Sequence, residues 1–279
     1  NGSNTLSSVT INYKIDNGPL STFNWTGNLN AFSTTSVNLP AIAAAAGTYK
    51  LTVYTSSPNG NYDSNPANDL KSGSFRAINT SSFPFTEGFS SGTFPPVGWD
   101  VIGFNKYSYM SRVGNIGGFG TNTGSVKMTI NIPAIEDNSG QIDYLMMPRI
   151  DLTSVPSSGT VLEFSMAHAQ YATTRNENLK VQVSVDCGLT WTTIYTKSGS
   201  TLATAPVTTG DFSPAASQWR KESVSLTPYI GQQAMFVFII QAANGNNIYI
   251  DDVNVKATGV SIAENDLDTY ISVFPNPVK

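Results

Sequence analysis

The sequence predicts an all-β protein, with an N-terminal Ig-like β-sandwich followed by a larger antiparallel β-jelly roll. Three observations favour this fold class. Apolar and polar residues alternate over many short stretches, which is the period of a strand with one buried face. Gly, Pro, Asn and Asp gather between these stretches, where turns need them. No segment carries an apolar stripe of helical period over three turns.

Composition excludes several classes of protein. Charged residues make up 12% of the chain, about half of the usual share of roughly 25%. Hydrophobic residues make up 40%, which is enough to build a buried core. The net charge of −4 argues against nucleic-acid binding, which requires a basic face. No apolar run approaches the ~18 residues of a membrane helix, so we expect no membrane insertion.

Residues 1–78 carry the strand pattern of the predicted Ig-like domain. Val9–Asp16 alternates cleanly, and the Asn17–Gly18 pair that follows is a strong turn signal because both residues tolerate positive φ. Further strands are expected around Phe23 and Trp25, at Ser36–Leu39, at Thr48–Tyr54 and at Phe75. Several short strands joined by turn residues indicate a small β-sandwich.

Residues 79–258 carry a longer series of strand signals, which predicts the second domain. The expected strands are Val126–Ile130, Ile142–Met147, Val161–Ala167, Leu179–Val185, Trp191–Tyr195, Ser223–Leu226, Ala234–Ile240 and Ile248–Val255. With the opening stretch Phe83–Asp100, about ten short strands and no long helix favour a jelly roll.

Acidic residues interrupt the first and last strands of this second domain. Glu87 lies between Phe85 and Phe89, and Asp251 follows two apolar residues near the end of the domain. A carboxylate among apolar neighbours is costly unless it is paired or binds a metal. Ca²⁺ takes several oxygen ligands, which can come from distant strands. We therefore expect a structural Ca²⁺ held by Glu87 and Asp251.

Two further acids are candidate ligands of this Ca²⁺, namely Asp252 and Asp143. In a regular strand Asp251 and Asp252 point to opposite faces, so only one of them should point inward. The alternative is that these acids bind no metal, cap loops and accept hydrogen bonds from backbone N–H groups. In the first domain, Asp63 and Asp69 belong to a polar loop that lacks the ligand spacing of an EF-hand, and Asx turns are the expected role of such residues.

The sequence shows no catalytic constellation. The chain has one histidine, His168, which follows a predicted strand and is expected to lie at a sheet rim. Its one cysteine, Cys187, cannot form an internal disulfide and is expected to be a small buried or half-buried residue. A triad or a zinc site would need more partners than these. We therefore expect no enzyme and name no catalytic residue.

Motifs of the second domain resemble the cleaved-adhesin, or choice-of-anchor J, family. The residues that carry this resemblance are Phe83-Pro84-Phe85, Glu87, Phe94-Pro95-Pro96, Gly98-Trp99, Asp143-Tyr144-Leu145, Val181, Val183, Ser184, Asp186, Gly188, Trp191, Trp219 and Ile250-Asp251-Asp252-Val253. The family is similar in architecture to MAM domains and jelly-roll carbohydrate-binding modules. The resemblance also implies a cation site, but the stretch Gly103–Tyr107 departs from the family pattern and puts ligands from that loop in doubt.

The tail, residues 259–279, resembles the start of a type A C-terminal sorting domain of the type IX secretion system. It contains an acidic linker, Glu264–Asp268, and ends in Val273–Lys279, with two prolines. The resemblance implies export across an outer membrane, with the secretion machinery as a partner.

Together these features predict a non-catalytic adhesion or ligand-binding module from the C-terminal region of a larger secreted or outer-membrane cell-surface protein. Its partner would be a glycan or a host or matrix protein. The alternative is a carbohydrate-binding accessory module of a secreted hydrolase or protease, in which an exposed aromatic side chain stacks on a sugar ring.

Overall fold

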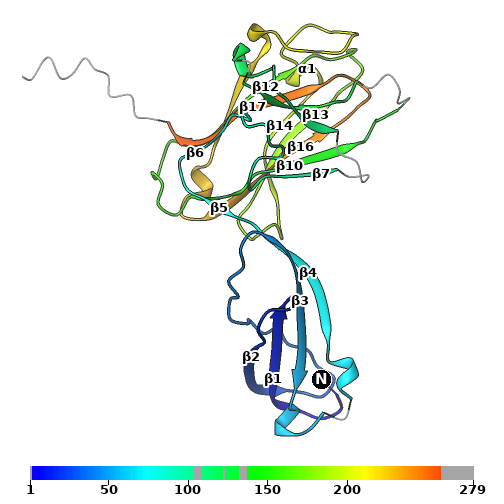
Figure 1. Cartoon of the computed structure of the whole chain (residues 1–279), viewed down its shortest axis with the longest axis vertical. Coiled ribbons are helices and arrows are strands. Elements are labelled where there is room, and N and C mark those ends of the chain that lie inside the picture. The colour runs from blue at the N-terminus through cyan, green and yellow to red at the C-terminus, as the bar shows by residue number, and fades with distance from the viewer. Residues whose placement is uncertain (1, 64, 104–108, 122, 132–136, 259–279) are drawn as a thin grey trace, which may run out of the picture. The chain divides into compact units, whose positions relative to one another are not determined.

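The computed structural model describes residues 2–63, 65–103, 109–121, 123–131 and 137–258 (Figure 1). The chain divides into two compact units, Asn1–Asn79 and the part from Thr80 onward. The predicted sorting-domain tail, residues 259–279, and the departing loop around Asn105 lie outside the described residues. The secretion role of the tail therefore stays a prediction.

The N-terminal unit contains one antiparallel sheet of four strands, in the order β2-β1-β3-β4. Its strands are β1 (Leu6–Ile15), β2 (Ser21–Leu29), β3 (Gly47–Ser56) and β4 (Lys71–Ala77). Figure 1 shows them side by side in blue to cyan. The alternation in Val9–Asp16 and the Asn17–Gly18 turn produce the β1–β2 hairpin, in which Ile11 lies opposite Phe23. Two 3₁₀ turns, η1 (Pro58–Gly60) and η2 (Pro66–Asn68), lie between β3 and β4.

This single sheet differs from the two-sheet sandwich that the sequence predicts. The expected strand at Ser36–Leu39 does not form, and the described strands of this unit make no second sheet. Among the described residues of this unit, Tyr13 is the one hydrophobic residue that is buried. Pro40 lacks the backbone N–H that a strand ladder needs, and the alanines after it lack the bulk that a facing sheet would need.

The unit from Thr80 is a sandwich of two sheets, antiparallel except for the β5–β11 pair. One sheet has the order β14-β13-β16-β10-β7, with β11 and β5 beside it. Its strands are β5 (Thr80–Ser81), β7 (Asp100–Gly103), β10 (Ile142–Met146), β11 (Arg149–Asp151), β13 (Asn178–Ser184), β14 (Thr192–Ser198) and β16 (Gln233–Gln241). The predicted strands at 142–147, 179–185 and 234–240 are thus confirmed within one residue, and the strand predicted at 191–195 is present but ends three residues later.

The second sheet has the order β15-β12-β17-β9-β8, and β6 pairs with β17. Its strands are β6 (Phe85–Glu87), β8 (Met110–Val113), β9 (Ser125–Met128), β12 (Thr160–His168), β15 (Arg220–Ser225) and β17 (Ile248–Ala257). The short strands β7, β8 and β11 were not predicted, because three or four residues are too few to display alternation. Within the described part of the chain, the only α-helix is α1 (Gly199–Leu202), and 3₁₀ turns occur at η3 (Gly118–Gly120), η4 (Ala216–Gln218) and η5 (Thr227–Tyr229).

The main hydrophobic core lies between these two sheets. Phe164 on β12 and Phe238 on β16 are both fully buried, and their rings meet edge to face with centroids 5.0 Å apart. Trp99 is buried as well, against Phe89, with centroids 5.3 Å apart. No helix in the described residues is long and apolar enough to cross a membrane.

Cys187 is exposed, contrary to the prediction of a buried or half-buried thiol. It lies in the β13–β14 hairpin with a φ of 60°. The turn is closed by Asp186, whose Oδ1 accepts the backbone N–H of Thr190 at 2.9 Å. Hydrogen bonds from the hydroxyl and N–H of Thr190 and from Ser184 lower the pKa of Asp186 to about 2. The turn therefore places the side chain of Cys187 outside the sheet.

The Phe164–Phe238 contact provides a stability test. Phe164→Ala removes a fully buried ring between the sheets, so we expect it to lower the free energy of unfolding by about 3–5 kcal/mol. Val185→Ala, at a side chain that is 42% exposed, should change it by less than about 0.5 kcal/mol. Urea denaturation of the full chain measures both, and equal effects of the two variants would contradict the assigned core.

Candidate functional site

Three of the four predicted metal ligands lie together at β6 and β17. Glu87 is the last residue of β6 and lies opposite Val253 of β17. Asp251 and Asp252 precede Val253 in the same strand. The predicted meeting of the opening and closing strands of the domain therefore occurs, and it brings these three carboxylates, here named the β6–β17 acid cluster, to one place.

Asp251 and Asp252 both approach Gly118, although a regular strand would send them to opposite faces. Asp252 has a left-handed φ of 48°, and the register between β12 and β17 shifts between Glu163 and Ser165. A side chain at Gly118 would collide with Asp252 Oδ2 and lie 3.3 Å from Asp251 Oδ2. Both carboxylates therefore reach Gly118 because the strand is irregular at this point, although only Asp251 is fully buried and Asp252 is half-buried.

Hydrogen bonds fix the carboxylates of the β6–β17 acid cluster. Asp251 is 1% exposed, and its Oδ2 accepts the N–H of Gly118 at 2.6 Å while its Oδ1 accepts the N–H of Asp252 at 2.7 Å. Asp252 Oδ2 accepts the hydroxyl of Ser165 at 3.0 Å, and Glu87 Oε1 accepts the N–H of Phe89 at 2.6 Å. These acids therefore also perform the loop-fixing role that was the alternative to metal binding.

The electrostatics of Asp251 are unfavourable for its charged form. Burial raises its pKa to about 6, the two backbone N–H bonds oppose this, and the charges of Asp252 and Glu87 add to it. No ion pair joins any of the three acids to a Lys or Arg within the described residues. A divalent cation would relieve this concentration of negative charge.

The β6–β17 acid cluster offers a hard cation the negative charge and the oxygen ligands that it prefers, with carboxylate oxygens of Asp251 and Asp252 beside Gly118. As placed, however, no three acidic, histidine or cysteine side chains of the described residues form a ligand group. Any further ligands would have to be carbonyl oxygens, hydroxyls or water.

Asp143 lies elsewhere, on β10 of the other sheet. It is fully buried, and its Oδ2 accepts the N–H of Tyr109 at 2.6 Å while its Oδ1 accepts from Gln141 Nε2 at 2.7 Å. The charges that raise the pKa of Asp251 are those of Asp252 and Glu87, and Asp143 is not among them. The structure therefore does not bring Asp143 to the β6–β17 acid cluster, and its hydrogen bond fixes Tyr109, the residue directly before β8.

His168 is the last residue of β12, at the end of its sheet as predicted, but it is completely buried and lies beside a buried acid that the sequence did not single out. Its Nδ1 is 3.1 Å from the carbonyl of Asn247, which makes Nδ1 the protonated nitrogen. Its Nε2 is 3.5 Å from Oε2 of Glu177, and both side chains are 0% exposed. Neither carboxylate oxygen of Glu177, nor His168 Nε2, has a hydrogen-bond partner among the described residues. Gly245 packs directly on this carboxylate, so any side chain there would collide with it.

The unit from Thr80 also has a surface cavity that sequence reasoning missed. Its volume is about 620 Å³, and it is lined by Lys127, Thr129, Asn131, Tyr171, Thr209, Gly210 and Asp211. Lys127 Nζ lies 3.5 Å from Asp211 Oδ2, and the guanidinium of Arg175 lies 4.6 Å from the centre of the Tyr171 ring. We call this hollow the Tyr171 cavity. No sequence motif marks it, because its residues come from separate segments.

The chain is similar to several solved structures at low sequence identity. No protein-family model and no curated protein matches the chain. The K1 cleaved adhesin domain of Lys-gingipain from Porphyromonas gingivalis W83 is 19% identical with a TM-score of 0.45, covering 63% of this chain and 99% of that chain. TmCBM61 in complex with β-1,4-galactotriose is 16% identical with a TM-score of 0.38, covering 61% and 94%. Caldicellulosiruptor saccharolyticus CBM27-1 in complex with mannohexaose is 14% identical with a TM-score of 0.40, covering 64% and 98%. Likenesses at this level assign neither a family nor a function to the chain.

The His168–Glu177 pair should be structural. His168→Ala leaves the Glu177 carboxylate buried without a partner, so we expect a loss of about 3–5 kcal/mol in the free energy of unfolding. The double change His168→Leu with Glu177→Leu should cost clearly less, because no unpaired buried charge remains. Urea denaturation of the full chain compares them, with the exposed Asp137→Asn as control. If His168→Ala cost no more than the control, the pair would have no structural role.

Proposed function

We propose that the unit from Thr80 is a non-catalytic ligand-binding module of a secreted or cell-surface protein. The observation that carries the proposal is the Tyr171 cavity. It combines an aromatic ring with a lysine, a carboxylate, an asparagine and two threonines. Sugars are bound by this combination of side chains, since an aromatic ring stacks on the apolar face of a sugar and polar groups hydrogen-bond its hydroxyls.

The surroundings of the reactive side chains support a non-catalytic role. The only histidine of the chain is fully buried, where no substrate can reach it. Glu163, which could have served as one acid of a glycosidase pair, lies 2.8 Å from Lys256 Nζ and 3.2 Å from Lys221 Nζ. These two ion pairs and the hydrogen bonds they make lower the pKa of Glu163 although partial burial opposes this. A carboxyl of that kind is unsuited to act as a general acid.

Within this proposal, Ca²⁺ has a structural role in the β6–β17 acid cluster. Glu87, Asp251 and Asp252 would hold it, and it would neutralise the charge where β6 meets β17. Binding to the folded chain alone would stabilise the domain by mass action. The proposal also includes attachment to an outer membrane through residues 259–279, which deletion of this tail would test. It further includes a host or matrix protein as the partner, which binding assays would test.

Glycan binding in the Tyr171 cavity can be tested by calorimetric titration of the full chain with mannohexaose and β-1,4-galactotriose. We expect saturable binding to at least one of them. Tyr171→Ala should weaken it by about tenfold, which corresponds to about 1.4 kcal/mol of lost stacking. Leu189→Ala, at a residue that is 85% exposed in the β13–β14 turn, is the control. Binding that Tyr171→Ala leaves intact, or no binding of either probe, would reject the cavity as the site for these sugars.

The Ca²⁺ proposal predicts a pH-dependent gain in thermal stability. The pKa of Asp251 is raised from 3.8 to about 6 by folding. The folded chain therefore binds more protons than the unfolded chain between these values, and without metal its stability falls as the pH rises through this window. Since Ca²⁺ binds the deprotonated carboxylate, millimolar Ca²⁺ should raise the Tm more near about pH 7 than near about pH 5.

Scanning calorimetry in Ca²⁺ and in chelator measures this difference. Asp251→Asn should lose most of the Ca²⁺-dependent shift, while Asp137→Asn, which removes one exposed charge far along the sequence, should retain it. Equal midpoints with Ca²⁺ and with chelator in the unmodified protein would remove the cation from the proposal and leave the ligand-binding module standing.

A further inference from the structure

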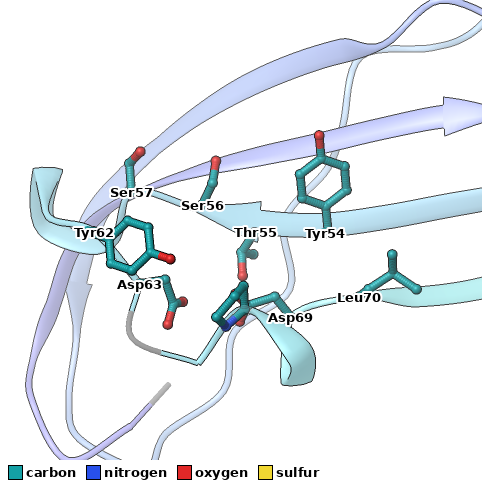
Figure 2. Close-up of a pocket in the computed structure, with 9 residues that line it drawn as sticks. Tyr54, Thr55, Ser56, Ser57, Tyr62, Asp63, Asp69 and Leu70 are labelled. Atoms are coloured by element: carbon teal, nitrogen blue, oxygen red, sulfur yellow. The ribbon is translucent and has the colours of Figure 1, made fainter.

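The N-terminal unit has a cavity of its own, between the end of β3 and the loop that leads to β4. Its volume is about 340 Å³. Tyr54, Tyr62 and Leu70 contribute apolar surface to its lining, while Thr55, Asp63 and Asp69 contribute oxygen atoms. Figure 2 shows the oxygens of Thr55, Tyr62 and Asp63 around the same space, with the hydroxyl of Tyr54 pointing away from it. We call this hollow the Asp63–Asp69 pocket.

Two carboxylates lie against each other in this pocket. The pKa of Asp69 is raised by partial burial and then by the hydrogen bonding and negative charge of Asp63, while the hydroxyl of Thr55 opposes this. The predicted Asx turn is present, because Asp63 Oδ1 accepts the N–H of Asn65 at 2.8 Å. This bond fixes Asp63 in place beside Asp69. The fold of this loop therefore keeps the acidic side chains of Asp63 and Asp69 close to each other although their negative charges repel.

Nothing in the described part of the chain neutralises these two charges. Asp69 Oδ2 is buried and has no hydrogen-bond partner there. Neither carboxylate makes an ion pair with a Lys or Arg of the described residues. Tyr62 is 89% exposed and Leu70 is 58% exposed at the mouth of the pocket. The pocket thus offers apolar walls, which remain open to solvent, and an acidic floor.

We propose that the Asp63–Asp69 pocket binds an alkylammonium group, in the form of a lysine side chain of a partner polypeptide. The ammonium group has three N–H donors, and Asp63, Asp69 and the hydroxyl of Thr55 provide three acceptors for them. The four-carbon stem of lysine would lie along Tyr62 and Leu70, as lysine stems do on apolar surfaces. The Tyr62 ring would also attract the cation by its electron-rich face.

Other occupants match the pocket less well. Ca²⁺ takes six to eight oxygen ligands, which is more than Asp63, Asp69 and the hydroxyl of Thr55 supply in this pocket. The apolar walls would also contribute nothing to binding a bare ion. A neutral sugar could stack on Tyr62 but would leave the repulsion between Asp63 and Asp69 uncompensated.

The proposal is tested by NMR titration of the full chain with Nα-acetyl-L-lysine methylamide. Its matched control ligand is the norleucine analogue, which has the same stem without the ammonium group. We expect saturable shifts of the amides at 54–57 and 65–70 with the lysine compound, and binding at least about tenfold weaker with the norleucine compound. Asp69→Asn should weaken lysine binding to a similar degree, and Asp137→Asn, an equal change of charge in the other unit, should not.

The other possible results of this titration also decide whether the pocket binds a lysine side chain. If Asp69→Asn fails to fold, as judged by circular dichroism, Asp63→Asn takes its place, and the comparison of the two ligands does not depend on either variant. Equal binding of the norleucine compound would mean that only the apolar walls bind. Saturable shifts of these same pocket amides with millimolar CaCl₂ but not with the lysine compound would mean that the pocket is an inorganic cation site. Both results, and the absence of saturable shifts with either ligand, would overturn the proposal.

Discussion

The burial of Asp251 in the middle of β17 is the constraint on which the rest of the second unit depends. β17 is hydrogen-bonded to β12, β9 and β6, so a carboxylate on this strand lies in the interior of its sheet. Its neighbours in sequence, Ile250 and Val253, are buried in the main core. The chain accommodates the charge by bending the strand at Asp252 and by placing the backbone of Gly118 against it. Glycine is the residue that permits this close approach.

The sequence was a good guide wherever strands were long enough to show alternation. β1, β3, β13 and β17 could be located from period-2 patterns, β16 from its continuous apolar run, and the meeting of β6 with β17 followed from acids placed among apolar residues. The single sheet of the N-terminal unit could not be foreseen, because alternation identifies a strand but not whether a second sheet covers its face. Ser36–Leu39 has a strand-like composition and no partner strand in the structure.

The candidate sites show the same limit at the level of side chains. Glu87 and Asp251 were identified from their apolar neighbours, and Asp143 was grouped with them although it lies in the opposite sheet. Asp252 joins Asp251 through a left-handed backbone conformation that residue type alone does not announce. Glu177 lies in a polar stretch and shows no sign of burial in the sequence, and its contact with His168 arises only when β12 ends beside the loop before β13. The Tyr171 cavity likewise combines residues that are up to about eighty positions apart.

The pairing of β6 with β17 also determines how the second unit would respond to a mechanical load. Phe85 lies opposite Val255, and Glu87 lies opposite Val253, so the chain enters β6 and leaves β17 at the same end of the pair. Tension applied along the polypeptide would therefore open this pair like a zipper, one hydrogen bond after another, rather than shear all of its bonds together. Thr80 and Ser81, which pair with β11, would bear the load on the N-terminal side before β6 does. The acidic residues lie at the inner end of the pair, where a bound ion would act as a stop against unzipping.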